Sequence, residues 1–107
     1  MEKGPSTFAE YWTSEFNENY HYNEHGEEMG FENITEYSKA AKDFIKNTDT
    51  KNILRFRDPS GAIYKYNKKT GEFAIISRNG KIVTYYILEG GTKSFWNLLL
   101  RDDGILL

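Results

Sequence analysis

Aromatic side chains in the first quarter of the chain recur at intervals of three to four residues, which is the spacing of one face of an α-helix. Thr7 and Glu10 fit a capping box at the start of this stretch, and the pattern predicts a helix over about residues 7–25. Gly26 follows at a position where a glycine in the left-handed conformation commonly ends a helix. The helix would present one stripe of rings to a core: Phe8, Tyr11, Trp12, Phe16 and Tyr20.

A second helix is predicted over about residues 34–46, where apolar positions again follow the helical period. Asn33 or Thr35 can cap its N-terminus, because a side-chain oxygen there accepts from the free N–H groups of the first turn. Lysines toward its C-terminal end suit the helix dipole. Its expected core stripe is Tyr37, Ala40, Ala41, Phe44 and Ile45.

From residue 52 onward the apolar pattern changes to that of extended strands. Turn residues, above all the hairpin pair Asn79-Gly80, separate four predicted strands at 53–57, 62–66, 72–77 and 81–88. For residues 94–100 the pattern favours a last strand over a short helix. Alternation in the fourth strand assigns to one face Ile82, Thr84, Tyr86 and Leu88.

These elements predict a single α+β domain over residues 1–107, with two N-terminal helices packed on a twisted antiparallel β-sheet of four or five strands at about residues 52–100. Aromatic residues make up 16% of the chain, which excludes disordered and collagen-like classes. Cysteine is absent, so disulfide frameworks and cysteine nucleophiles are excluded. No apolar run approaches the ~20 residues of a membrane span, and the first residues lack an apolar segment of signal-peptide type.

Charge is segregated along the chain, although the net charge is only −2. Residues 1–50 hold four lysines against eleven Asp or Glu, a net charge of −7, whereas residues 51–81 hold eight Lys or Arg against two acids, a net charge of +6. The overall balance argues against a polybasic, histone-like nucleic-acid binder. The division of charge between the two segments indicates either an ordinary solvated surface or a basic middle segment that binds a polyanion.

His21 and His25 are the only histidines and lie four residues apart, on one face of the first predicted helix. Three interpretations are open. The run fits the H-x-x-E-H zinc pattern with Glu24 as base, although no third ligand stands out in the sequence. Both rings also suit an exposed helix C-terminus, where the dipole favours a protonated imidazole. The third interpretation is acid–base catalysis, for which the near-neutral pKa of histidine is suited.

Thr84 and Tyr86 share a face of the fourth predicted strand, so their hydroxyls are either cross-strand contacts or ligands of a phosphate. Basic and aromatic residues interleave on the neighbouring strands, a combination that binds the phosphates and bases of single-stranded RNA. The candidate phosphate ligands are Arg55, Arg57, Lys65 and Lys81.

Three motifs stand in a characteristic order along residues 20–88: His25-Gly26, Tyr64-Lys65-Tyr66-Asn67 and Thr84-Tyr85-Tyr86. With the segments around them, this stretch resembles the C-terminal toxin domains of bacterial polymorphic and contact-dependent inhibition systems. Those domains belong to the barnase, EndoU, colicin and RelE-like (BECR) ribonuclease superfamily.

The resemblance implies a metal-independent endoribonuclease without a cofactor that cuts RNA, often tRNA, by attack of the ribose 2′-hydroxyl. By motif, His25 would be the acid–base residue, with His21 a second candidate, and Thr84 and Tyr86 would orient the scissile phosphate. A nearby cation would stabilise the phosphate charge, the candidates being Arg55 and Lys81.

The resemblance also implies a cognate immunity protein that blocks the site of a monomeric toxin, and delivery as part of a larger bacterial effector that acts in the cytoplasm of a target cell. The alternative is a non-catalytic module that binds a protein or RNA through the basic, aromatic sheet face, with both histidines incidental.

Overall fold

The N-terminal helical layer consists of shorter elements than the sequence pattern predicts. In the computed structural model, which describes residues 8–107, a 3₁₀ turn at Ala9–Tyr11 precedes helix α1, Glu15–His21. Ser14 caps α1, and its Oγ accepts from the N–H of Asn17 at 2.9 Å. The predicted start at Thr7 and Glu10 is wrong: Glu10 lies in the 3₁₀ turn, and Thr7 lies outside the described residues.

The interruption has a tertiary cause. Trp12 is extended and forms a parallel bridge with Ile82, and the N–H of Thr13 donates to the Ile82 carbonyl at 3.1 Å. Because these residues pair with the edge of the sheet, they cannot continue a helix.

A π-helical turn, Tyr22–Gly26, follows α1 directly. Gly26 is buried, and a Cβ there would overlap the ring of Tyr22, so close packing requires glycine. The predicted left-handed conformation at Gly26 is wrong. Gly30 adopts it instead, with φ +91°, one turn further along the chain.

Helix α2, Ile34–Lys46, confirms the predicted second helix and its cap. Asn33 Oδ1 accepts from the N–H of Glu36 at 2.9 Å. The helix is joined to α1 through a buried contact in which Ser38 Oγ donates to Glu18 Oε2 at 2.5 Å.

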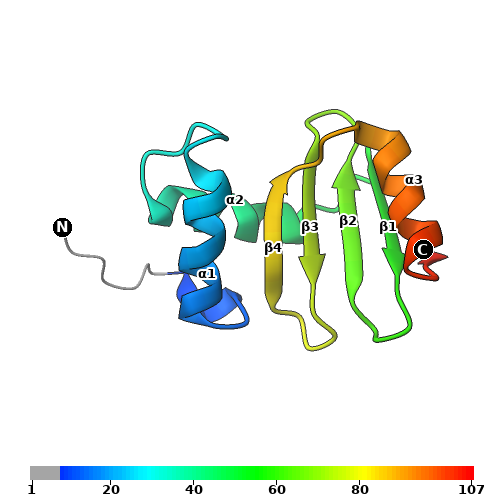
Figure 1. Cartoon of the computed structure of the whole chain (residues 1–107), viewed down its shortest axis with the longest axis horizontal. Coiled ribbons are helices and arrows are strands. Elements are labelled where there is room, and N and C mark those ends of the chain that lie inside the picture. The colour runs from blue at the N-terminus through cyan, green and yellow to red at the C-terminus, as the bar shows by residue number, and fades with distance from the viewer. Residues whose placement is uncertain (1–7) are drawn as a thin grey trace.

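The four predicted strands are confirmed to within one residue at each end, as an antiparallel meander of β1 (Ile53–Arg57), β2 (Ile63–Asn67), β3 (Glu72–Ile76) and β4 (Ile82–Ile87). A short fifth strand, β5 (Ile105–Leu106), pairs with β1 and gives the sheet order β4-β3-β2-β1-β5. Helix α1 lies beside β4, at the side of the sheet opposite α3 (Figure 1).

A bulge between β3 and β4 changes which face Ile82 occupies. Ile75 pairs with Thr84 but Ile76 pairs with Ile82, so Val83 is an extra residue in β4. The prediction that Ile82 shares a face with Thr84 is therefore wrong. Thr84 and Tyr86 do share a face, because alternation resumes after the bulge.

The expected last strand at 94–100 is wrong, because residues Gly91–Arg101 form helix α3 and the sheet does not extend through them. Phe95 is fully buried, and Leu98 and Leu99 pack in the same cluster, which is helical spacing. Gly104 donates its N–H to the Leu99 carbonyl at 2.7 Å and closes the helix.

The sheet carries a hydrophobic cluster on each face. Helix α2 covers one face, with a buried cluster of Trp12, Tyr37, Ala41, Phe44, Ala74, Ile82 and Tyr85. Helix α3 packs on the other face near β1 and β2, with a buried cluster of Phe56, Tyr64, Tyr66, Phe73 and Phe95. No helix within residues 8–107 has the length and apolar character needed to cross a membrane.

Candidate active site

The N-terminal layer attaches to β4 at positions four residues apart, of which the first, Thr13, precedes α1 and binds through its backbone. Thr13 donates its N–H to the Ile82 carbonyl. One turn later, Asn17 Nδ2 donates to the carbonyl of Val83 at 2.8 Å. The carbonyl of the bulged residue is therefore bound by α1, which fixes the helix along the strand.

The same spacing continues to the two histidines. His21 Nδ1 lies 3.1 Å from Thr84 Oγ1, within hydrogen-bond distance. The His25 ring stacks on Tyr86, with ring centroids 4.8 Å apart and an interplanar angle of 24°. The structure therefore brings together four sequence-predicted site residues from two distant parts of the chain.

The aromatic rings form a continuous column. The rings of Trp12 and His21 stack with centroids 6.2 Å apart, and those of His21 and His25 with centroids 5.7 Å apart and an angle of 11°. Trp12 is buried, so the column begins in the core and ends at Tyr86 on the sheet. This packing restricts the orientation of both imidazoles.

The environment of His21 favours its neutral form. Burial is the largest cause of a lowered pKa for His21, the positive form of His25 adds to it, and the Glu24 carboxylate opposes it. A neutral imidazole has one ring nitrogen that accepts a proton and one that donates, which is the state a general base needs.

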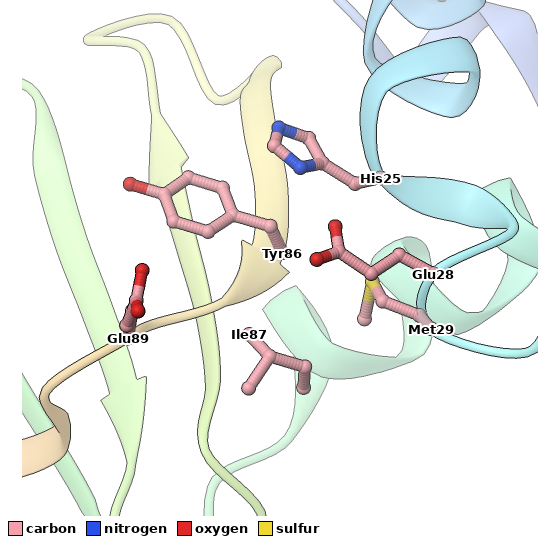
Figure 2. Close-up of a pocket in the computed structure, with 6 residues that line it drawn as sticks. All are labelled: His25, Glu28, Met29, Tyr86, Ile87 and Glu89. Atoms are coloured by element: carbon pink, nitrogen blue, oxygen red, sulfur yellow. The ribbon is translucent and has the colours of Figure 1, made fainter.

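His25 lies at the rim of a pocket of about 550 Å³ beside β4. Figure 2 shows the His25 ring at one side of the Tyr86 ring, with Glu28 and Glu89 on different sides of the opening. The pocket is lined by His25, Glu28, Met29, Tyr86, Ile87 and Glu89. Among residues 8–107, no lysine or arginine lines this pocket, and the sequence analysis assigned no role to either carboxylate.

The four predicted phosphate ligands do not join the histidines. Arg55 and Lys65 are paired across β1 and β2, on the α2 side of the sheet, whereas Thr84 and Tyr86 face the α3 side. Arg57 lies two residues from Arg55, on the same side. Lys81, in the β3–β4 turn, donates through Nζ to the Glu10 carbonyl at 2.5 Å.

Lys65 is held inside the fold. Its Nζ donates to the carbonyls of Ile45 and Asn47, at 3.0 and 2.7 Å, and only 5% of the residue is exposed. Burial and, secondarily, the charge of Arg55 lower the pKa of Lys65. The ammonium group therefore stabilises the C-terminal end of α2, and the structure does not present it to a phosphate.

Arg101 is the cation that the sequence patterns missed. Burial raises the pKa of the Tyr86 hydroxyl, and the positive charge of Arg101 acts against that rise. Arg101 ends the helix whose Phe95 packs in the same cluster as Tyr86. The signal for it was available: Phe95, Leu98 and Leu99 have the spacing of a helix that ends at Arg101.

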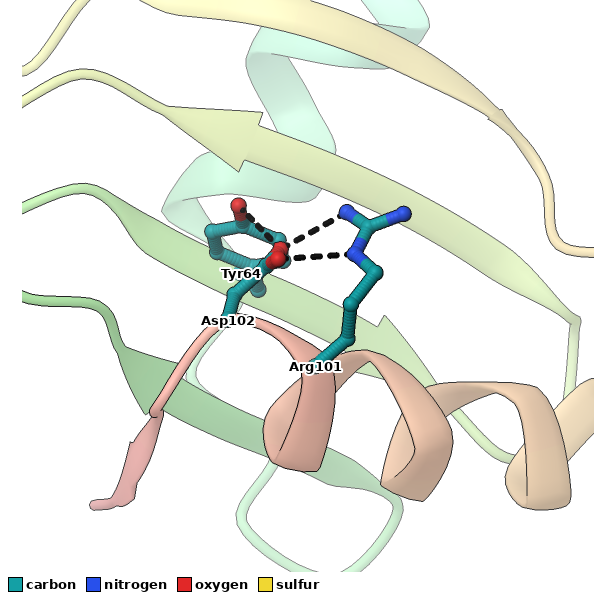
Figure 3. Close-up of polar contacts among 3 residues, drawn as sticks. All are labelled: Tyr64, Arg101 and Asp102. Carbon is teal, nitrogen blue, oxygen red and sulfur yellow. Dashed lines mark hydrogen bonds and ion pairs between the residues drawn. The ribbon is translucent and has the colours of Figure 1, made fainter.

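Figure 3 shows how this guanidinium is oriented. Arg101 Nε and Nη2 donate to the two carboxylate oxygens of Asp102, each at 2.7 Å. Asp102 in turn accepts from the Tyr64 hydroxyl at 2.8 Å. Burial, followed by this hydrogen bond, raises the pKa of Tyr64 to about 12.

Within residues 8–107, no group of three His, Asp or Glu side chains gathers in a geometry that would hold a metal ion. The zinc interpretation of the His21–His25 run therefore finds no third ligand in this part of the chain.

No protein-family model matches the chain, and a search of curated proteins finds no significant relative.

Proposed function

We propose that this chain is a metal-independent endoribonuclease that cleaves RNA, with tRNA as the substrate class. In the reaction, a base takes the proton of a ribose 2′-hydroxyl, the 2′-oxygen bonds to the adjacent phosphorus, and the P–O5′ bond breaks. An acid protonates the departing 5′-oxygen, which leaves a 2′,3′-cyclic phosphate and a 5′-hydroxyl.

One observation carries the proposal. Two imidazoles from the helical layer meet a threonine and a tyrosine of β4, and one of the two pairs, His25 with Tyr86, lines an open pocket. The resemblance to BECR toxin domains, through the motifs at His25 and at Thr84-Tyr85-Tyr86, gives independent support.

We assign His21 as the base, because its lowered pKa keeps it neutral and because donation from its Nδ1–H to Thr84 Oγ1 leaves Nε2 to take the proton. His25 is assigned as the acid, because its ring stacks on Tyr86 and makes no hydrogen bond to residues 8–107. The Tyr86 hydroxyl and Arg101 are assigned to the phosphate, since Arg101 ends the helix whose Phe95 packs in the same cluster as Tyr86.

This assignment orients the substrate. Glu28 and Glu89 repel a phosphate from the pocket itself. We therefore place the scissile phosphate on the α3 side of His25, against the Tyr86 hydroxyl. A cognate immunity protein and delivery into a target cell by a larger effector belong to the same proposal, from the resemblance alone.

The test is incubation of the purified chain with total tRNA, with and without EDTA, followed by mapping of the new RNA ends. Cleavage that persists in EDTA and leaves cyclic-phosphate ends is expected, and a substrate with a 2′-deoxy sugar at the cut site should survive. His25→Ala should lower cleavage by about 10²–10⁴-fold. Asn23→Ala is the matched control, because Asn23 is exposed on the same helical turn. RNA that stays intact across pH and salt conditions contradicts the proposal.

The second candidate function is a non-catalytic module that binds a basic partner. Glu28 and Glu89 favour it, because they line a pocket to which residues 8–107 contribute no lysine or arginine. Glu28→Gln with Glu89→Gln separates the two functions. In the nuclease these substitutions reduce repulsion and lower KM for RNA. In the binding module they abolish affinity for a lysine-rich peptide, and RNA is not cut by either form.

A further inference from the structure

A second concave surface lies at the end of the sheet formed by the β1–β2 and β3–β4 turns. It is a pocket of about 530 Å³, separate from the pocket at His25. Its lining includes Arg57, Ser60, Gly61, Ser77, Arg78 and Gly80, and no Asp or Glu of residues 8–107 lines it. Both arginines are exposed.

The charge of these two arginines is not neutralised by the rest of the described chain. Within residues 8–107, neither Arg57 nor Arg78 forms an ion pair with a carboxylate. Asp58, the nearest acid in sequence, is occupied within its own turn, where it accepts from the N–H groups of Ser60 and Ala62 at 2.9 and 3.0 Å. The pocket therefore presents two positive charges to solvent.

The two turns are built to stand close together. Gly61 has φ +93°, and a Cβ at that position would approach the Arg78 side chain to 3.1 Å. Glycine therefore lets the stem of Arg78 lie against the neighbouring turn. Within the β3–β4 turn, which carries Arg78, Ser77 Oγ accepts from the N–H of Lys81 at 3.0 Å and closes the turn.

We infer that this pocket binds backbone phosphates of single-stranded RNA, away from the cleavage site, and holds the substrate by charge. The inference rests on the proposed function for its choice of RNA. A guanidinium fork matches two phosphate oxygens, so two unpaired arginines in one concavity suit adjacent phosphates.

The composition of the pocket favours a nucleic acid over an acidic protein. Protein interfaces depend on large apolar anchors at their centre. None of the exposed large apolar side chains within residues 8–107 lines the pocket, although Ile105 pairs with Arg57 in the neighbouring strand. The apolar part of the lining is Pro59 and the partly buried Ile63 and Ile76. Arginines, serines and glycine backbone are the groups that contact a phosphate backbone.

The experiment measures affinity for a fluorescent single-stranded RNA as a function of salt, in a His25→Ala background that keeps the RNA intact. Each phosphate contact on single-stranded RNA contributes a slope of about −0.7 in log K against log salt. Arg57→Gln and Arg78→Gln should each reduce the steepness of that slope by about 0.7, and together by about 1.4.

Lys68→Gln and Lys69→Gln are the matched controls, because these exposed lysines lie in the β2–β3 turn at the opposite end of the sheet. They should leave the slope unchanged. An equal reduction in all four variants, no reduction in the arginine variants, or no RNA binding at all would overturn the inference. So would a polyglutamate that binds more tightly than RNA through the same arginines. If the slope changes only in the arginine variants and the chain with His25 intact does not cut RNA, the proposed nuclease is rejected and the binding site is kept.

Discussion

Replacing Thr84 with valine removes one hydroxyl from the contact between β4 and the histidines while keeping the shape of the side chain. Thr84 is 6% exposed, and its Oγ1 lies 3.1 Å from His21 Nδ1. A neutral hydrogen bond of this kind contributes about 1 kcal/mol to stability. For a domain of this size we expect the melting temperature to fall by roughly 4–8 °C.

The effect on His21 is the more specific part of the prediction. For Nε2 to be the free acceptor that a base needs, the ring Nδ1–H donates to the Thr84 hydroxyl. This bond is stronger for the protonated ring than for the neutral one, so its loss should lower the pKa of His21 further. If His21 is the base that Thr84 orients, losing about 1–1.5 kcal/mol in the transition state also lowers kcat by about tenfold.

NMR titration of the two imidazoles, thermal unfolding and RNA cleavage together test this reasoning. Thr84→Ser should restore the pKa of His21 and the rate. Thr92→Val is the matched control, because its hydroxyl lies 3.3 Å from the Tyr66 hydroxyl, on α3, and not against an imidazole. A titration of His21 unchanged by Thr84→Val would refute donation from Nδ1–H to the Thr84 hydroxyl, and an unchanged kcat would refute the positioning of the base.

Two further predictions concern buried charge. Because the pKa of His21 is lowered by folding, the unfolded chain binds more protons between that pKa and 6.5. The free energy of unfolding should therefore fall as the pH drops below about 6.5, until the pKa of the folded state is reached. His21→Gln should remove this part of the pH dependence, which urea unfolding at pH 5–8 measures. The same pH dependence in the variant would count against the prediction. Lys65→Met should lower the free energy of unfolding by about 2 kcal/mol, because the Ile45 and Asn47 carbonyls lose a charged donor. Arg55→Met is the control: Arg55 is exposed, so its replacement should change the free energy of unfolding by less than about 0.5 kcal/mol. Equal losses in the two variants would show that the α2 terminus does not depend on Lys65.

The sequence by itself determined the elements whose signals are local. Asn33 and the apolar spacing from Tyr37 to Phe44 are enough for α2, because cap and stripe lie within one helix. The four strands follow from alternation and from turns such as Asn79-Gly80, where Gly80 has φ +86°. The shared face of Thr84 and Tyr86 is another local consequence, because alternation within one strand requires it.

Only the tertiary structure decided the composition of the site. The meeting of His21 with Thr84 joins positions 63 residues apart, and it depends on α1 docking along β4. The separation of Arg55 and Lys65 from Tyr86 depends on which face of the sheet α2 covers. The position of α3, which ends at Arg101, depends on the packing of Phe95 in the cluster that includes Tyr86. Each is set by the burial of surfaces from different elements against one another, and a local pattern does not encode the partner that a surface finds.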